Sequence, residues 1–263
     1  MGAKESNVMI RKITSLCLVG LVAVAALNNA AVRAETRDAN ALLDKVDDLY
    51  RGDSSEGQMS MVIVTENWTR TLVAEMASKG KDNTFIRILE PKKERGTTTL
   101  RVGKDIWNYL PKVDRVIKLP SSMMSVSWMG SHVTNNDLVR ESRFSEDFNC
   151  SIAFDGEKEG QAIIEIDCLP LEDAAVEWGK VGLTLDAAKE LPMEVRYFDE
   201  DLVLARTITY SNLRLVDDRE MPTTMIVIPA DEPEESTTVT YDKITFDVDI
   251  ADDFFSIRRL REN

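Results

Sequence analysis

Polar and hydrophobic residues alternate with a period of two over most of the chain. Thr207, Thr209 and Ser211, for example, alternate with Ile208 and Tyr210, and Met59, Met61 and Ile63 recur at every second position. Alternation of this kind places successive side chains on opposite faces of a β-strand. It predicts further strands at 70–78, 84–89, 97–102, 106–110, 115–119, 150–154, 161–168, 179–186, 192–199, 203–215, 221–228 and 237–244. Short polar turns separate these segments, as in an antiparallel meander.

Two segments depart from this rhythm. Residues 39–50 carry leucines and valine at helical spacing, with Asp and Lys on the other face, and Gly52 is placed to end the helix. Residues 121–149 are rich in serine, methionine and asparagine, with a helix start at 134–138, and they predict a loop with short helices. Residues 252–255 are expected to end the sheet region with a short tail.

So many antiparallel strands in one chain predict one large curved sheet. An open sheet of roughly ten strands must curl or close because strand twist accumulates. Its concave face then needs filling by side chains, helices or a ligand. The helix at 39–50 and the segment 121–149 are the available covers.

The N-terminal residues 1–34 have the pattern of a cleaved secretory signal peptide. Basic residues precede an uncharged apolar run at 13–27, and Val32 and Ala34 offer small side chains before Glu35. The run is about 15 residues, shorter than the roughly 20 that span a bilayer. We therefore expect residues 35–263 to form a single mature domain that is exported from the cytoplasm. A retained membrane anchor is the alternative.

The chain is strongly acidic. Its formal net charge is −14, and loss of four basic residues and one acidic residue with the signal would take it to −17. Such a surface repels nucleic acid phosphates, so no nucleic acid partner is expected. The charge could equally serve solubility alone.

Two cysteines lie beyond the signal, Cys150 and Cys168. They flank a predicted hairpin that turns near Glu159, which would set the two sulfur atoms opposite each other. In an oxidising compartment they are expected to form a disulfide. Two unpaired core thiols are the alternative.

Six methionine and aromatic side chains lie close together between residues 107 and 129. Trp107 and Tyr109 lie two apart on one strand, and the segment 123–129 adds methionines and a tryptophan between serines. Flexible thioethers and flat rings suit an adaptable apolar surface, although ordinary core packing is the alternative. The candidate residues for binding an apolar ligand are Met59, Met61, Ile63, Trp68, Met76, Phe85, Trp107, Tyr109, Leu110, Met123, Met124, Trp128 and Met129.

Polar candidates are fewer. A group of basic residues near two turns could bind a lipid headgroup or dock on a partner, with solvated turn charges as the alternative: Lys92, Lys93, Arg95, Lys112 and Arg115. The single histidine, His132, has no second metal ligand nearby in sequence. We therefore expect no metal site. No nucleophile elbow is present, so we expect no enzyme activity, and we expect no cofactor.

Several motifs together resemble a known family. They are the segment 90–96 (EPKKERG), the segment 107–111 (WNYLP), the segment 127–131 (SWMGS) and the pair Asp137-Leu138. With these, the chain from the first helix to Phe255 is similar to the outer-membrane lipoprotein-sorting proteins of the LolA-like superfamily.

The resemblance implies a LolA/LolB-like fold, mainly β with flanking helices, in which an unclosed antiparallel barrel of about eleven strands is covered by a helical lid. It implies a periplasmic carrier that binds acyl chains of lipoproteins or lipids in a hydrophobic cavity and ferries them between the inner and outer membranes. The implied partners are an inner-membrane transporter of the resistance-nodulation-division (RND/MMPL) or ABC type and an outer-membrane acceptor. The alternative is a non-enzymatic accessory subunit that docks on such a transporter. The founding family also has a lid-locking arginine, for which Arg95 and Arg115 are the candidates.

Overall fold

A computed structural model describes residues 37–135, 137, 144–172, 174 and 176–262. The chain divides into two compact units, Met1–Thr36 and Arg37–Asn263, and all described residues belong to the second. The predicted signal peptide therefore lies outside the described residues. None of the helices in the described ranges has the length and hydrophobicity that a membrane crossing requires.

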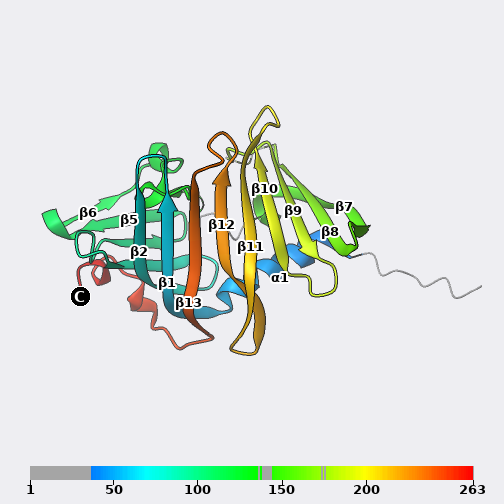
Figure 1. The fold of residues 1–263 in the computed structure, drawn as a ribbon. Coiled ribbons are helices and arrows are strands. Elements are labelled where there is room, and N and C mark those ends of the chain that lie inside the picture. Colours follow the sequence, from blue (N-terminus) through cyan, green and yellow to red (C-terminus); the bar gives the residue numbers. More distant parts are fainter. Residues whose placement is uncertain (1–36, 136, 138–143, 173, 175, 263) are drawn as a thin grey trace, which may run out of the picture. The chain divides into compact units, whose positions relative to one another are not determined.

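One sheet of thirteen strands forms the described part of the chain (Figure 1). Its spatial order is β6-β5-β4-β3-β2-β1-β13-β12-β11-β10-β9-β8-β7. The strands are β1 (Ser54–Val64), β2 (Thr69–Lys79), β3 (Asn83–Glu90), β4 (Thr98–Val102), β5 (Asp105–Leu110), β6 (Arg115–Lys118), β7 (Phe148–Lys158), β8 (Gln161–Pro170), β9 (Lys180–Asp186), β10 (Pro192–Phe198), β11 (Leu204–Val216), β12 (Arg219–Pro229) and β13 (Ser236–Phe246).

The sheet consists of two antiparallel meanders joined in the middle. Strands β1 to β6 form one meander and β7 to β13 the other, and β13 pairs antiparallel with β1. The outermost strands β6 and β7 lie at opposite ends of this order, so the sheet is open. The predicted mainly β, unclosed architecture is confirmed, with thirteen strands in place of about eleven.

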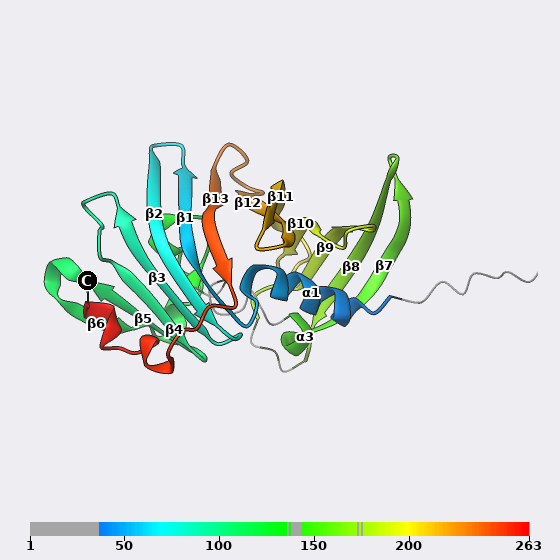
Figure 2. The same cartoon turned by 90° about the horizontal axis from the view of Figure 1, so that it is seen from below.

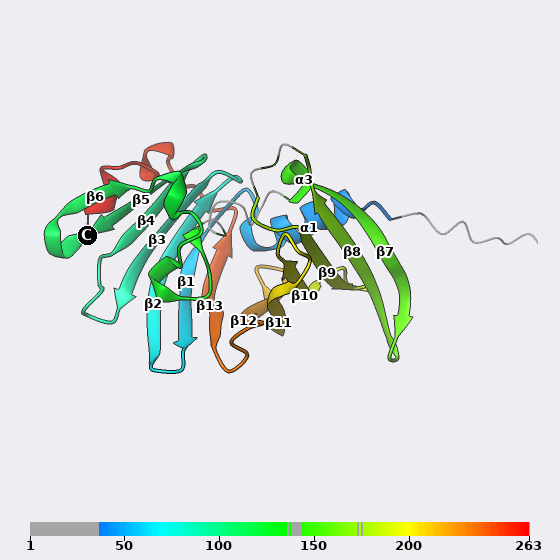
Figure 3. The same cartoon turned by 90° about the horizontal axis from the view of Figure 1, so that it is seen from above.

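Alternation predicted the strands well because one face of the sheet is buried along most of its length. Every predicted strand segment coincides with one of the observed strands, within a few residues at the ends. The sheet curves, and helix α1 (Ala39–Arg51) lies in its concavity (Figures 2 and 3). The side chain of Asp38 caps this helix by accepting a hydrogen bond from the Asn40 N–H, and Gly52 ends it with a φ of 57°.

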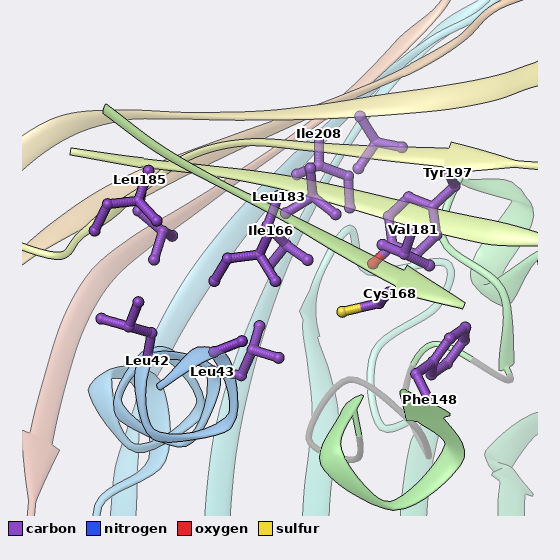
Figure 4. Close-up of a cluster of buried hydrophobic side chains, with 14 residues drawn as sticks. Leu42, Leu43, Phe148, Ile166, Cys168, Val181, Leu183, Leu185, Tyr197 and Ile208 are labelled. Carbon is purple, nitrogen blue, oxygen red and sulfur yellow. The ribbon is translucent and has the colours of Figure 1, made fainter. Parts of the chain in front are cut away.

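Helix α1 is held by its apolar face. Leu42 and Leu43 point at Ile166, Leu183 and Leu185 of β8 and β9 (Figure 4). All five side chains are buried. Full burial contributes about 2 kcal/mol for each leucine, which exceeds what helix propensity alone offers a helix this short.

The segment between β6 and β7 covers the other half of the concave face. It contains the 3₁₀ turns η2 (Ser121–Met123) and η3 (Trp128–Gly130) and the short helix α3 (Phe144–Asp147). Trp128 packs here against Met59 and Met61 of β1. Part of the helix start predicted at 134–138 lies outside the described residues. We call residues 121–147, as far as they are described, the lid segment.

The C-terminal segment, residues 247–262, folds back over the outer face of β2 to β5. Ile250, Phe255 and Leu260 pack there against Phe85 and Leu100. The sequence predicted only a short tail after the last strand. Hydrophobic residues on both faces of these strands are therefore explained by two separate covers, the lid segment inside and the C-terminal segment outside.

The predicted hairpin pairs Cys150 of β7 directly with Cys168 of β8. The two form a disulfide with a sequence separation of 18. The alternative of two free thiols is wrong. Disulfides of this kind form in oxidising compartments.

Candidate functional site

A cavity lies between the concave face of the sheet and its two covers. Its floor comes from neighbouring strands whose side chains point to one face because of the two-residue period. The apolar floor residues are Met59, Met61, Met76, Ile86, Leu183, Val195, Met225 and Val239.

Aromatic rings and the lid segment complete the cavity. Tyr50 of α1 stacks on Tyr241 with ring centroids 5.6 Å apart and lies 6.3 Å from Tyr210. Trp128 and Phe144 of the lid segment close the cavity from the other side. Aromatic and methionine side chains make up half of the lining residues, which suits apolar ligands of variable shape.

The cavity is small in this conformation. Its volume is about 150 Å³, and the atom-free space that includes the open mouth is about 1170 Å³. An apolar cavity of about 150 Å³ accepts a guest the size of benzene. A second hollow of about 60 Å³ adjoins it and shares Val133, Phe144, Tyr197, Met225 and Val239. A longer hydrocarbon chain would require the lid segment or α1 to shift.

Trp128 anchors the lid segment to the sheet. Its side chain is buried and its Nε1–H donates to Thr99 Oγ1 of β4 at 3.0 Å. Its backbone N–H donates to the carbonyl of Val133 at 2.7 Å, which folds the lid segment on itself. Arg70 of β2 donates to the carbonyl of Met129 and also contacts Glu94.

A buried ion pair ties the lid segment to the other half of the sheet. Arg206 of β11 donates to both carboxylate oxygens of Asp137, at 2.7 and 2.5 Å. The side chains are 8% and 15% exposed. The guanidinium also stacks on Tyr197 and Trp178, at 4.3 and 4.9 Å. Burial by itself lowers the pKa of Arg206, but the hydrogen bonds and charge of Asp137 outweigh burial and leave the pKa raised.

A third polar tie involves the single histidine. The Nδ1 of His132 lies 2.9 Å from Thr237 Oγ1, and its Nε2 lies 3.1 Å from Glu235 Oε2. The backbone N–H of Glu66 donates to the other oxygen of Glu235 at 2.7 Å. This N–H and then His132 lower the pKa of the Glu235 carboxyl.

Four of the residues predicted to bind an apolar ligand line the cavity: Met59, Met61, Met76 and Trp128. Ile63 and Met129 belong to the same hydrophobic cluster but lie outside the lining.

The other predicted residues lie elsewhere. Phe85, Trp107 and Tyr109 face the outer side of the sheet, where they pack under the C-terminal segment. Met124 packs against Ile106 and Leu119. The remaining three have exposed side chains, namely Trp68, Leu110 and Met123.

Sequence reasoning missed the contribution of the C-terminal meander to the cavity. Tyr210 and Met225 lie directly opposite each other in the β11–β12 pair. Tyr210 lies between Thr209 and Ser211, and Met225 between Thr224 and Ile226, in strands that were both predicted. The signal that would have placed them in the cavity is the pairing of β13 with β1, which no local pattern encodes.

The predicted basic residues come together at one end of β3 to β6. Lys92, Lys93 and Arg95 lie in the β3–β4 turn. Lys112 lies in the β5–β6 turn, and Arg115 is the first residue of β6; all five are exposed. A Cβ added to Gly96 would lie 3.6 Å from Pro111 Cγ, so the two turns touch. We call this group the basic end.

In the part of the chain that the structure describes, neither predicted candidate for a lid-locking arginine makes a hydrogen bond or ion pair to the lid segment. Arg95 Nε donates to the carbonyl of Leu89 beside its own turn, and Arg115 is an exposed residue of β6. Among the described residues, Arg70 and Arg206 are the arginines that donate hydrogen bonds to the lid segment. Arg206 was not predicted because its partner Asp137 is 69 residues away.

The fold is similar to that of several solved structures. A LolA superfamily protein of Nitrosomonas europaea has a TM-score of 0.73 and 22% identity, covering 85% of this chain and 100% of that one. An outer membrane lipoprotein-sorting protein domain from Vibrio parahaemolyticus has a TM-score of 0.73 and 21% identity, with 85% and 99% covered. A DUF1329 family protein from Desulfovibrio piger has a TM-score of 0.77 and 20% identity, with 86% and 100% covered. The predicted resemblance to the LolA superfamily is confirmed at the level of the fold.

The family is defined more narrowly by sequence. Residues 80–262 match a family model whose description is "Uncharacterized protein". The chain belongs to this family. No match was found among curated proteins.

Proposed function

We propose that this protein is a non-enzymatic periplasmic carrier. It shields the acyl chain of a lipoprotein or lipid and ferries it between the inner and outer membranes. The observation that supports this most is the apolar cavity between a curved sheet and a lid segment, lined by Met59, Met61, Met76 and Met225. The LolA-like fold supports a carrier role, and the disulfide supports an oxidising envelope compartment.

Burial of hydrocarbon is the driving force in this proposal. Each methylene removed from water contributes about 0.8 kcal/mol. A six-carbon stretch, the size that the present cavity admits, would gain about 5 kcal/mol before the costs of immobilisation. A full acyl chain therefore binds when the lid segment moves aside, and the polar ties of that segment set the cost of opening.

The experiment is uptake of a fluorescent acyl probe by purified protein, together with lipid extraction and mass spectrometry. Met76→Glu places a charge on the cavity wall, whereas Met123→Glu places the same charge on an exposed position of the lid segment. We expect the first to weaken probe binding at least tenfold and the second to leave it within twofold. Protein that purifies empty and takes up no probe would overturn the proposal.

A second function is favoured by the basic end. Exposed Leu110, Val113 and Ile117, at 38%, 59% and 41%, lie beside its five cations in an otherwise acidic protein. A mixed apolar and basic surface suits docking on a membrane or on a membrane protein. In this alternative the chain is an accessory subunit of an RND-type or ABC-type inner-membrane transporter, and the basic end is its docking surface.

The two functions separate in one comparison. Leu110→Glu alters the basic end, and Leu215→Glu alters a 72% exposed leucine on β11 as a matched control. If the first variant loses capture of a detergent-solubilised inner-membrane protein but keeps acyl probe binding, docking occurs at the basic end. Equal capture of the membrane protein by both variants would exclude the basic end as the docking surface.

A further inference from the structure

His132 and two glutamates converge where the lid segment meets the β12–β13 connection. One ring nitrogen of His132 and one carboxylate oxygen each from Glu232 and Glu235 lie within 4.8 Å of one another. His132 and Glu235 are largely buried, with side chains 14% and 15% exposed, while Glu232 is exposed. The three residues therefore surround a point that is open to solvent on one side.

The geometry suits a small tetrahedral metal ion. With metal–ligand bonds of about 2.0–2.1 Å, two ligand atoms of a tetrahedral site lie about 3.3 Å apart. His132 Nε2 and Glu235 Oε2 are 3.1 Å apart. Three protein ligands leave the fourth position for water on the solvent side.

The surrounding hydrogen bonds orient both buried ligands. Thr237 Oγ1 lies 2.9 Å from Nδ1 of His132 and also accepts a hydrogen bond from the backbone N–H of His132 at 3.0 Å. The N–H of Glu66 holds Oε1 of Glu235 at 2.7 Å, which leaves Oε2 directed at the histidine. Such contacts to the far side of each ligand are the usual supports of a metal centre.

We propose that His132, Glu232 and Glu235 bind a divalent transition metal ion, with Zn²⁺ as the best fit. An imidazole nitrogen in the donor set favours Zn²⁺ over Ca²⁺ and Mg²⁺, which prefer oxygen ligands only. His132 belongs to the lid segment, whereas both glutamates belong to the β12–β13 connection. The ion therefore fastens the lid segment to the sheet, beside the tie from Arg206 NH1 to the carbonyl of His132 at 3.3 Å. This site is independent of what the cavity holds.

The test is titration calorimetry of the metal-free full-length mature protein with ZnCl₂, and with CaCl₂ for comparison. We expect one zinc site per chain, weakened at least tenfold in both His132→Gln and Glu232→Gln. Glu232 is exposed, so its variant keeps the fold if the histidine variant does not. Glu234→Gln, also exposed and two residues away, is the matched control and should bind zinc within twofold of the natural protein.

A second measurement reports on the lid. Hydrogen exchange of the amides of Trp128 and Ser131 should slow at least tenfold when zinc is added to the natural protein, and should not change in Glu232→Gln. The absence of zinc binding, or equal binding by all variants, would show that a proton alone links His132 to Glu235. Calcium binding as tight as zinc would overturn the metal assignment.

Discussion

Replacement of Asp137 by alanine should release the lid segment from the sheet. Asp137 is the carboxylate partner of Arg206, and both side chains are largely buried. In Asp137→Ala the guanidinium would stay between Tyr197 and Trp178 without its counter-charge. Loss of one partner of a buried ion pair costs about 3–5 kcal/mol.

For Asp137→Ala the expected loss of stability is at the lower end of this range, about 3 kcal/mol. Arg206 keeps its stacking on two rings and its contact with the carbonyl of His132 at 3.3 Å. If opening of the lid segment rehydrates Arg206, the same free energy in Asp137→Ala shifts the equilibrium from the closed lid segment to the open one. A loss of about 3 kcal/mol changes that equilibrium roughly 150-fold.

Two assays measure the effect. Urea denaturation gives the free energy of unfolding, and hydrogen exchange of the Trp128, Ser131 and Asn135 amides gives the opening of the lid segment. Exchange at these amides should rise about 150-fold, at 1.36 kcal/mol for each factor of ten. Exchange in the β8–β9 pair should not change, because α1 covers that region independently.

A double-mutant cycle separates the pair from its surroundings. Arg206→Met removes the cation and keeps an apolar side chain of similar length. In the double variant Arg206→Met/Asp137→Ala no charge is left buried, so its loss should be smaller than the sum of the two single losses by about 2 kcal/mol. Additive losses within about 0.5 kcal/mol, or unchanged exchange in Asp137→Ala, would refute the role of this pair.

Three further predictions concern stability. Replacement of both Cys150 and Cys168 by serine should lower the free energy of unfolding by about 3 kcal/mol, since the disulfide closes a loop with a sequence separation of 18; equal urea midpoints would contradict this. Ile63→Ala should cost about 2–4 kcal/mol because Ile63 is fully buried, whereas Ile117→Ala, at an exposed position, should stay within about 0.5 kcal/mol. Glu235 has a lower pKa in the folded chain than its ordinary value of 4.5, so it adds stability above that pH and loses it as the pH falls through the folded value. In Glu235→Gln the free energy of unfolding should therefore fall less steeply as the pH is lowered, when it is measured in EDTA. An unchanged pH dependence would exclude this contribution of Glu235.

The strands could be predicted from the sequence because their alternation reflects burial on one face. Alternation shows which residues share a face, but it cannot show which face is concave. Phe85 and Trp107 illustrate this limit. Both belong to strands that were correctly predicted, yet both point outward because Leu100 lies opposite each of them and packs with them under the C-terminal segment.

The polar interactions that hold the lid segment could not be predicted from the sequence, for a different reason. His132 meets Glu235 across 103 residues, and Asp137 meets Arg206 across 69. Contacts of this separation depend on the pairing of β1 with β13, which brings the two meanders together. By contrast, Cys150 and Cys168 pair across a single hairpin, and their disulfide followed from local spacing.

Photocrosslinking with a diazirine-labelled acyl chain tests the cavity most directly. The label should attach to residues that line the cavity, with Met61, Met76 and Met225 as the expected sites in peptide mass spectrometry. Excess unlabelled acyl chain should suppress this labelling. Labelling confined to exposed residues such as Leu110 and Leu215, or unaffected by competitor, would contradict binding of acyl chains in the cavity.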